Sequence, residues 1–377
     1  MNTQIFNPFL VSGYESPSYF CDREEETNDI IETLRNGRNI TLTSPRRIGK
    51  TGLIKHTFYR LKQLDAKAIC IYIDLFPTNS LADFTRSFSS SVLGQLDSDP
   101  AKMLKMMADL FKGLRPTMTF DELSGRPKFG VEIAKGGEEH TLDQIFEYLK
   151  RSGKACVIAF DEFQQIAAYP EKNVEALLRS YIQDLHNVRF IFSGSQSHML
   201  REMFLSPQRP FYQSTSEKNI GAIPERAYNL FAGEFFKNQG RQLPEEVFHN
   251  LYARYEGYTW YVQMILNRMY AKAGRTMDDE LLQECVGDIL RENDYYYQQL
   301  LRSFTAGQKS LVKAIAAEKL VKEISSGAFI SKYGLTATSS VKGALKVLLD
   351  QEIVYPSNEG YIIYDRFFAE WLRATFC

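Results

Sequence analysis

Cysteine is scarce in this sequence and forms no recognisable motif. The five cysteines lie far apart in 377 residues and include no CxxC pair: Cys21, Cys70, Cys156, Cys285 and Cys377. A disulfide framework needs an even, clustered set, and a zinc site needs closely spaced ligands. The pattern therefore supports neither, and it is typical of reduced thiols in a cytosol.

Long apolar runs and a basic leader are also lacking. No apolar run approaches the roughly 20 residues that a membrane helix needs. The first residues, MNTQIFNPFLVSGY, have no basic region before their apolar residues and do not read as a signal peptide. We expect a soluble, cytoplasmic protein with no membrane partner.

Excess charge of either sign is missing as well. The formal net charge is -1, from 45 basic and 46 acidic residues. Bulk electrostatics therefore call for no nucleic acid, and only a local basic patch would bind one. A hydrophobic content of 44% with 24% charged residues is that of a globular protein, and the length suggests two or three domains.

Strands and helices alternate over the first part of the chain. Apolar or β-branched runs predict strands at 38–44, 67–75, 154–163 and 188–195. Amphipathic runs predict helices that begin at Lys50 and that span 140–154 and 175–185. Residues 80–114 are expected to form two helices with a break near 98–100. A Ser-Gly turn predicts a hairpin within 116–137. Strands apolar on both faces indicate a parallel sheet covered by helices.

The pattern changes twice after this α/β region. Four amphipathic helices are expected at 224–240, 243–257, 259–274 and 277–293, and then three helices and a hairpin at 304–318, 326–334, 338–352 and 353–365. Three helices followed by a hairpin describe a winged helix. We therefore predict three domains: an α/β core at 1–225, a helical lid at 226–302 and a winged helix at 303–377.

Residues 44–51, SPRRIGKT, match the phosphate-binding pattern GxxxxGK[ST] everywhere but the first position. A strand precedes them and a helix follows, as that motif requires. The predicted nucleotide-binding residues are Ser44, Pro45, Arg46, Arg47, Ile48, Gly49, Lys50, Thr51 and Gly52. Lys50 would reach the β and γ phosphates, and Thr51 would place its hydroxyl on Mg²⁺. The alternative is a solvated basic turn.

A second motif, VIAFDEF at 157–163, ends an apolar strand in two carboxylates. With Lys50 upstream, Asp161 is predicted to hold Mg²⁺ and Glu162 to activate the attacking water. The alternative is that the two acids cap the next helix. After the following strand, a polar residue that senses the γ-phosphate is expected at Ser193, Ser195 or Gln196.

These motifs resemble the archaeal-type ATPases of the STAND and AAA+ branch of P-loop proteins, in particular a bacterial subgroup. The matching stretches are YFCDREEE, NITLTSPRRIGKT, IYIDL, VIAFDEFQQI, FIFSGSQSHML, EGYTWYVQ and YDRFFAEWL. The resemblance implies a P-loop core of strand order 5-1-4-3-2, a helical lid, a C-terminal winged helix, and ATP or ADP with Mg²⁺ as cofactors.

The resemblance also assigns individual residues. Arg23 and Glu26 match the family's hhGRExE motif, which braces the nucleotide, and Asp22 stands at its glycine. Gly257 matches the lid's GxP stretch, in which Thr259 replaces the proline. The family's Gly-Arg after the sensor strand is Gln213-Ser214 here, and Arg209 is the nearest substitute.

Several groups keep two interpretations. Arg46 and Arg47 would contact phosphate or a partner subunit, or pair with an acid of the lid. The residues Tyr295, Tyr296 and Tyr297 would stack bases, or pack the lid against the winged helix, which we favour. The winged helix would contact DNA phosphates or, as we favour, a protein; its polar and basic candidates are Thr336, Thr338, Ser339, Ser340, Lys342, Lys346, Lys332 and Arg366.

The leading hypothesis is a slow, Mg²⁺-dependent ATPase that acts as a nucleotide switch. It would bind an unknown protein partner, and it could also form nucleotide-dependent oligomers. The second is a DNA-binding winged-helix regulator in which the nucleotide is mainly structural. The third, an assembly in defence or signalling, rests on fold-level analogy alone.

Overall fold

The computed structural model describes residues 6–96, 115–120, 127–132, 136–357 and 359–377. The chain forms two compact units. The sheet unit comprises Leu10–Tyr228 with Tyr258–Trp260, and the helical unit comprises Asn229–Gly257 and Tyr261–Cys377 with the N-terminal residues up to Phe9. Each is described by itself.

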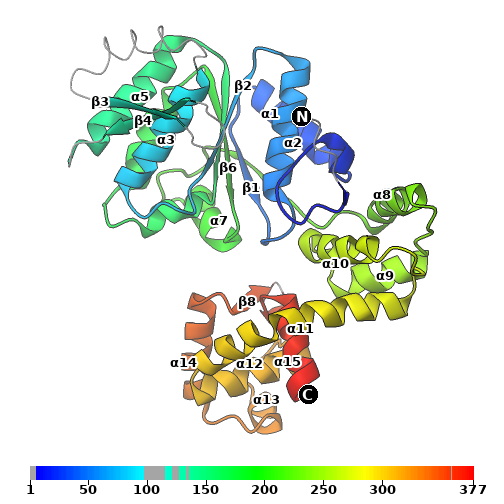
Figure 1. Cartoon of the computed structure of the whole chain (residues 1–377). Coiled ribbons are helices and arrows are strands. Elements are labelled where there is room, and N and C mark those ends of the chain that lie inside the picture. Colours follow the sequence, from blue (N-terminus) through cyan, green and yellow to red (C-terminus); the bar gives the residue numbers. More distant parts are fainter. Residues whose placement is uncertain (1–5, 97–114, 121–126, 133–135, 358) are drawn as a thin grey trace. The chain divides into compact units, whose positions relative to one another are not determined.

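A parallel five-stranded sheet organises the sheet unit (Figure 1). Its order is β2-β5-β6-β1-β7, and every pairing is parallel. The strands are β1 (Ile40–Thr43), β2 (Ile69–Asp74), β5 (Cys156–Asp161), β6 (Val188–Gly194) and β7 (Ser216–Asn219). Numbered along the chain without the hairpin, this is the predicted order 5-1-4-3-2, which is therefore confirmed.

Helices cover both faces of this sheet (Figure 1). The α-helices of the unit are α1 (Glu24–Arg35), α2 (Lys50–Leu64), α3 (Leu81–Leu96), α5 (Glu138–Ser152), α6 (Val174–Gln183) and α7 (Ser197–Leu205); short 3-10 helices are η1 (Pro17–Tyr19) and η2 (Phe163–Ala168). Successive side chains of a strand point to opposite faces. In β6, Phe190 and Phe192 pack in the core under α3, α5 and α7, whereas Ile191 packs in the core under α1 and α2.

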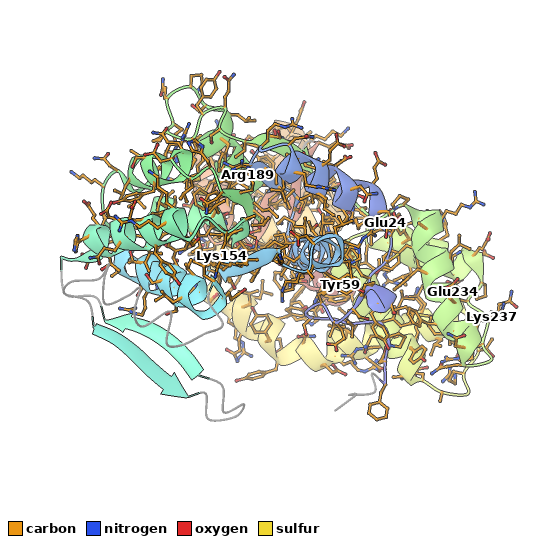
Figure 2. All side chains as sticks on the ribbon, turned by 90° about the horizontal axis from the view of Figure 1, so that it is seen from above. Glu24, Tyr59, Lys154, Arg189, Glu234 and Lys237 are labelled. Carbon is orange, nitrogen blue, oxygen red and sulfur yellow. The ribbon has the colours of Figure 1, made fainter. Side chains whose placement is uncertain are left out.

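The predicted hairpin is confirmed as an antiparallel pair. Strand β3 (Arg115–Phe120) pairs with β4 (Pro127–Glu132). Its turn and the predicted second helix within 80–114 lie outside the described residues. The amino ends of β5 and β6 carry the basic residues Lys154 and Arg189, labelled in Figure 2, at the edge of the sheet opposite to the two carboxylates of the 157–163 motif.

The helical unit begins within α8 (Glu225–Asn238), whose Glu234 and Lys237 are exposed (Figure 2). The elements that follow are α9 (Glu245–Arg254), α10 (Thr259–Ala271), α11 (Asp279–Ser303), α12 (Ala306–Glu318), α13 (Gly327–Lys332), α14 (Thr338–Asp350), β8 (Val354–Ser357), β9 (Gly360–Ile363) and α15 (Arg366–Phe376). The succession of α12, α13 and α14 followed by the antiparallel β8–β9 hairpin confirms the predicted winged helix. The helix α15 was not among the predicted elements.

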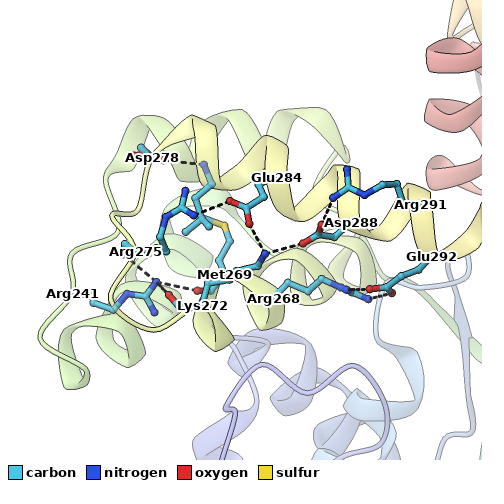
Figure 3. A network of polar contacts seen from close by, with 11 residues as sticks. Arg241, Arg268, Met269, Lys272, Arg275, Asp278, Glu284, Asp288, Arg291 and Glu292 are labelled. Atoms are coloured by element: carbon cyan, nitrogen blue, oxygen red, sulfur yellow. Dashed lines mark hydrogen bonds and ion pairs between the residues drawn. The ribbon is translucent and has the colours of Figure 1, made fainter.

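A polar network joins α10 to α11 (Figure 3). Lys272 bridges Glu284 and Asp288, and Arg268 forms a two-pronged pair with Glu292 at 2.6 Å for each bond. Arg241 donates to the carbonyls of Met269, Tyr270 and Lys272, which satisfies the end of α10. Solvent screens exposed pairs of this kind, so they add little to the stability of the unit.

The three consecutive tyrosines of α11 do not act together. Tyr297 is buried against Phe368 and Trp371 of α15, with ring centroids 5.2 and 5.7 Å apart. Tyr295 and Tyr296 are 75% and 60% exposed. The packing interpretation therefore holds for Tyr297 and is wrong for its two neighbours, because three successive helical positions cannot share one face.

Within the described residues, no helix combines the length and apolar composition needed to cross a bilayer.

Candidate nucleotide-binding site

The carboxyl ends of β1, β5 and β6 meet at one edge of the sheet and bring the predicted site residues together. Leu42 of β1 lies opposite Ser193 of β6, and Phe160 of β5 lies opposite Phe192 of β6. The segment Ser44–Gly49 follows β1, Glu162 follows β5 and Ser195 follows β6. Parallel strands place their loops at the same edge, and ligands bind there in open α/β sheets.

The turn between β1 and α2 has the backbone that its sequence predicts. Gly49 has a φ of 100° and Arg47 a φ of 67°, so this turn uses the left-handed region twice. Ser44 is buried and is not among the residues with positive φ. The absent first glycine is therefore not needed for the turn. Gly52 lies in the first turn of α2, where an added Cβ would come 3.2 Å from the ring of Phe20.

Lys50 is held inside this turn. Its Nζ donates to Ser44 Oγ at 2.9 Å, to the Ser44 carbonyl at 3.1 Å and to the Pro45 carbonyl at 3.3 Å. Burial lowers the pKa of Lys50 to about 8, although Glu162 and Asp161 oppose that shift. A buried ammonium with a lowered pKa favours an added anion, because the anion would stabilise the charged form.

Asp161 is the most heavily hydrogen-bonded carboxylate of the site. Its Oδ2 accepts from the hydroxyls of Thr51 and Tyr72, both at 2.7 Å. Its Oδ1 accepts from Ser193 Oγ at 2.5 Å and from the Glu162 amide at 3.1 Å. Burial and the Asp161 carboxylate raise the pKa of the Tyr72 hydroxyl, which therefore stays a donor.

Thr51 and Asp161 provide a donor set that fits Mg²⁺. A hydroxyl and a carboxylate oxygen are the hard ligands that this ion takes together with water and phosphate. Among the described residues, no group of three or more His, Cys, Asp or Glu could hold a metal by itself. A metal here would therefore need ligands from a nucleotide or water in addition to these two residues.

Glu162 is fixed by the end of β6. It follows β5 with a φ of 54°. Its Oε2 accepts from Gln164 Nε2 at 2.5 Å and from Ser195 Oγ and N at 2.7 and 3.1 Å. The same Ser195 hydroxyl accepts from Arg46 Nε at 2.7 Å. A chain of contacts thus runs from the P-loop arginine through Ser195 to Glu162, and it depends on Gly194, where a Cβ would lie 2.0 Å from Gln164 Oε1.

Two other segments brace the turn from outside. Arg23 is 3% exposed and donates to the carbonyls of Gly221 and Ile48 at 2.7 and 3.5 Å, while it pairs with Glu26. Thr259 Oγ1 donates to the Ile48 carbonyl at 2.9 Å, a bond that the family's proline could not make. Its neighbour Trp260 donates its amide to the Arg47 carbonyl at 3.0 Å and lies under the Arg47 guanidinium at 4.3 Å.

The structure brings some of the predicted site residues together and places others elsewhere. The contacts above join six of them: Arg46, Thr51, Asp161, Glu162, Ser193 and Ser195. Lys50 is bonded to Ser44 and Pro45, and the charges of Asp161 and Glu162 act on it without a hydrogen bond to either. Gln196 caps α7. Arg209 pairs with Glu175 at 2.5 Å and approaches Glu202 at 3.7 Å, which are acids of α6 and α7 and not Glu162. Tyr72, Gln164 and Trp260 were not predicted as site residues. The signal that marked Tyr72 was a hydroxyl within the apolar strand IYIDL.

Comparisons with protein families and with solved structures place the chain among known proteins. A family model described as an ATPase domain predominantly from Archaea matches residues 20–265, and a probable winged helix domain matches residues 295–374. A search of curated proteins finds no match.

Similar solved structures cover nearly the whole chain. The Walker-type ATPase of Pyrococcus abyssi is 17% identical, with a TM-score of 0.65 over 97% of this chain and 99% of that one. The ORC2 protein of Aeropyrum pernix, in ADPNP–ADP complexes, is 15% identical, with a TM-score of 0.61 over 97% of both chains. The ORC1 protein of the same organism, in complex with DNA, is 15% identical, with a TM-score of 0.56 over 98% and 97%.

These structures share the fold, and the family model covers well over half of the sequence. The chain belongs to the family of ATPase domains found predominantly in Archaea.

Proposed function

We propose that this protein binds ATP and ADP with Mg²⁺ and hydrolyses ATP slowly, as a nucleotide-dependent switch of the STAND and AAA+ type. The observation that carries the proposal is the convergence of Lys50, Thr51, Asp161 and Glu162 at one edge of the sheet. The presence of nucleotide in the similar ORC2 structure supports the choice of ligand.

Each residue has a role in this proposal that follows from its contacts. Lys50 and the amides of residues 46–51 would bind the phosphates. Thr51 and Asp161 would hold Mg²⁺, which would supply positive charge to the phosphates. Glu162 accepts a proton from the attacking water. Its carboxylate is bonded to Ser195, so a γ-phosphate that draws Arg46 and Ser195 away would free Glu162 for that water. This exchange is the proposed switch.

Steady-state ATP turnover tests the proposal with two variants and two controls. Lys50→Ala is expected to abolish ATP binding, whereas Lys62→Ala, at the exposed far end of the same helix, is expected to bind normally. Glu162→Gln is expected to bind ATP and to lose at least about a hundredfold in turnover, since a positioned base contributes that much. The exposed Glu139→Gln serves as its control. Equal turnover in wild type and Glu162→Gln would refute the role of Glu162.

DNA binding is the second candidate function, and the winged helix favours it. The ORC1 protein in its DNA complex shares this architecture. The exposed face of α14 carries Lys342 and Lys346. Two other predicted basic contacts are already paired, since Lys332 contacts Glu318 at 2.6 Å and the buried Arg366 contacts Glu256 at 3.0 Å. Two exposed lysines make a small basic surface for DNA, so a protein partner is favoured instead. Another copy of the chain, in a nucleotide-dependent oligomer, is a further candidate partner.

A gel shift across a salt series separates these partners. Binding through two lysines would weaken with a salt slope of about -2. That slope should fall by about one in Lys342→Ala and stay unchanged in Lys322→Ala, an exposed lysine outside α14. Absence of salt-sensitive binding to any duplex would reject the DNA proposal.

A further inference from the structure

The helical unit has a cavity of about 590 Å³, open to solvent, between α9, α11, α12, β9 and α15. All of its lining residues belong to this one unit. Small side chains on three helices leave the space: Ala253, Ala316, Ala369 and Ala374. The volume is in the range of small-molecule sites, which usually span about 300–1,000 Å³.

One face of α15 provides much of the wall. Its lining residues recur with helical spacing: Arg366, Ala369, Glu370, Arg373 and Ala374. The residues between them, Phe367, Phe368 and Trp371, are buried on the other side of the helix. The sequence therefore gives α15 a separate polar face with two alanines, and that face lines the cavity.

The charges around the cavity do not balance. Four basic and two acidic side chains line it. Arg254 holds Glu370 with two bonds at 2.6 and 3.0 Å, and Arg366 pairs with Glu256 at 3.0 Å. Two cations remain, the exposed Lys319 and the half-buried Arg373, and no ion pair joins either to a carboxylate within the described part of the chain. Arg373 donates to the Ala316 carbonyl at 3.2 Å, and burial lowers the pKa of its guanidinium, although the Glu370 carboxylate opposes that shift.

We propose that this cavity binds a small phosphate monoester that carries hydroxyl groups. At neutral pH such a group has a charge between about -1.5 and -2, which matches the two surplus cations. Glu256 and Glu370 offer carboxylate oxygens that accept bonds from ligand hydroxyls, and the alanines contact its carbon skeleton. The proposal concerns a second site and does not depend on nucleotide binding at the P-loop.

The two tryptophans allow a direct test, because each belongs to a different unit. Trp371 lies on α15, and Trp260 lies against Arg47 in the sheet unit. The full chain is labelled with 5-fluorotryptophan and followed by ¹⁹F NMR while glucose 6-phosphate is added to about 10 mM, a range that detects even weak binding. We expect a saturable shift of the Trp371 signal with the Trp260 signal unchanged, and no shift with glucose.

Variants identify the site. Lys319→Gly and Arg373→Ala are each expected to weaken glucose 6-phosphate binding at least about tenfold, the size of a charge-assisted contact. Lys319 has a φ of 63°, so glycine relieves backbone strain there and the loss cannot be ascribed to unfolding. Lys322→Ala removes the same charge three residues away and should bind as wild type.

Three outcomes of these experiments would overturn the proposal. They are no shift of the Trp371 signal with glucose 6-phosphate, an equal shift with glucose, and equal affinity in Lys319→Gly, Arg373→Ala and Lys322→Ala. A Trp371 shift produced by duplex DNA and not by glucose 6-phosphate would also overturn it, and would point to the winged helix as a nucleic-acid surface.

Discussion

Raising the pH should weaken ADP binding through the titration of Lys50. Burial lowers the pKa of this ammonium to about 8 from an ordinary value of 10.5. A bound phosphate would restore the charged form and raise that pKa. A return to the ordinary value corresponds to about 3 kcal/mol of coupling between phosphate and proton.

The direction of the pH effect on ADP affinity follows from the direction of the pKa shift of Lys50. Binding raises the pKa of Lys50, so the full affinity is present below about pH 8 and is lost as the pH rises above it. Between about pH 8 and 10 the dissociation constant should increase by up to tenfold per pH unit. The nucleotide itself does not titrate in that window, because the second pKa of a phosphate is near 6.

Isothermal titration calorimetry with ADP measures both the affinity and the proton uptake. In buffers of different ionisation enthalpy, the wild type should take up close to one proton per ADP at about pH 9 and almost none at about pH 7. Lys50→Arg is the matched control, since a guanidinium stays charged over this range. A flat affinity profile, or the same slope in Lys50→Arg, would refute the reasoning.

Three further substitutions test the contacts around both units. Gly194→Ala would place a Cβ 2.0 Å from Gln164 Oε1, so we expect a loss of about 1–3 kcal/mol in the free energy of unfolding by urea, and none for Gly343→Ala, which has nothing within 4 Å. Tyr72→Phe removes one of four donors to Asp161 and should lower the free energy of unfolding by about 1–2 kcal/mol. Tyr59→Phe should cause no loss, because Tyr59 is 40% exposed. Equal values for the two variants would show that the Tyr72 hydroxyl does not support Asp161. Arg254→Met leaves the buried Glu370 without its two-pronged partner and should lower the free energy of unfolding by about 3 kcal/mol, measured by thermal unfolding. Arg268→Met removes an exposed pair and should lower it by less than about 1 kcal/mol. Similar losses in the two variants would contradict this prediction.

The sequence predicted the inner strands of the sheet because their physical signal is strong. Strands buried on both faces read as continuous apolar runs, as in VIAF before Asp161 and RFIF before Ser193. Strand β7 was missed by this pattern, since Ser216–Asn219 is short, polar and half exposed at the edge of the sheet. Only the resemblance to the ATPase family implied a fifth strand.

The candidate site was predictable as far as it is contiguous in sequence. Residues 44–51 build the turn by themselves, and the two acids follow an obvious strand. The bracing contacts were not predictable, because they join distant parts of the chain: Tyr72 reaches Asp161 across 89 positions, and Thr259 reaches Ile48 across 211. Only the fold brings such residues together.

Two serines, Ser44 and Ser195, hold the cations of the site, Lys50 and Arg46, and a bound nucleotide would replace these serines. Ser44 replaces the first glycine of the motif and gives Lys50 a hydroxyl acceptor that glycine lacks. Ser195 does the same for Arg46 and also holds Glu162. Phosphate oxygens accept stronger, charge-assisted bonds than serine hydroxyls do. An arriving triphosphate would therefore displace both serines, charge Lys50 fully and release Glu162. The proton uptake measured with ADP would report on the exchange at Lys50 and Ser44, and the γ-phosphate of ATP would add the exchange at Arg46 and Ser195 that frees Glu162.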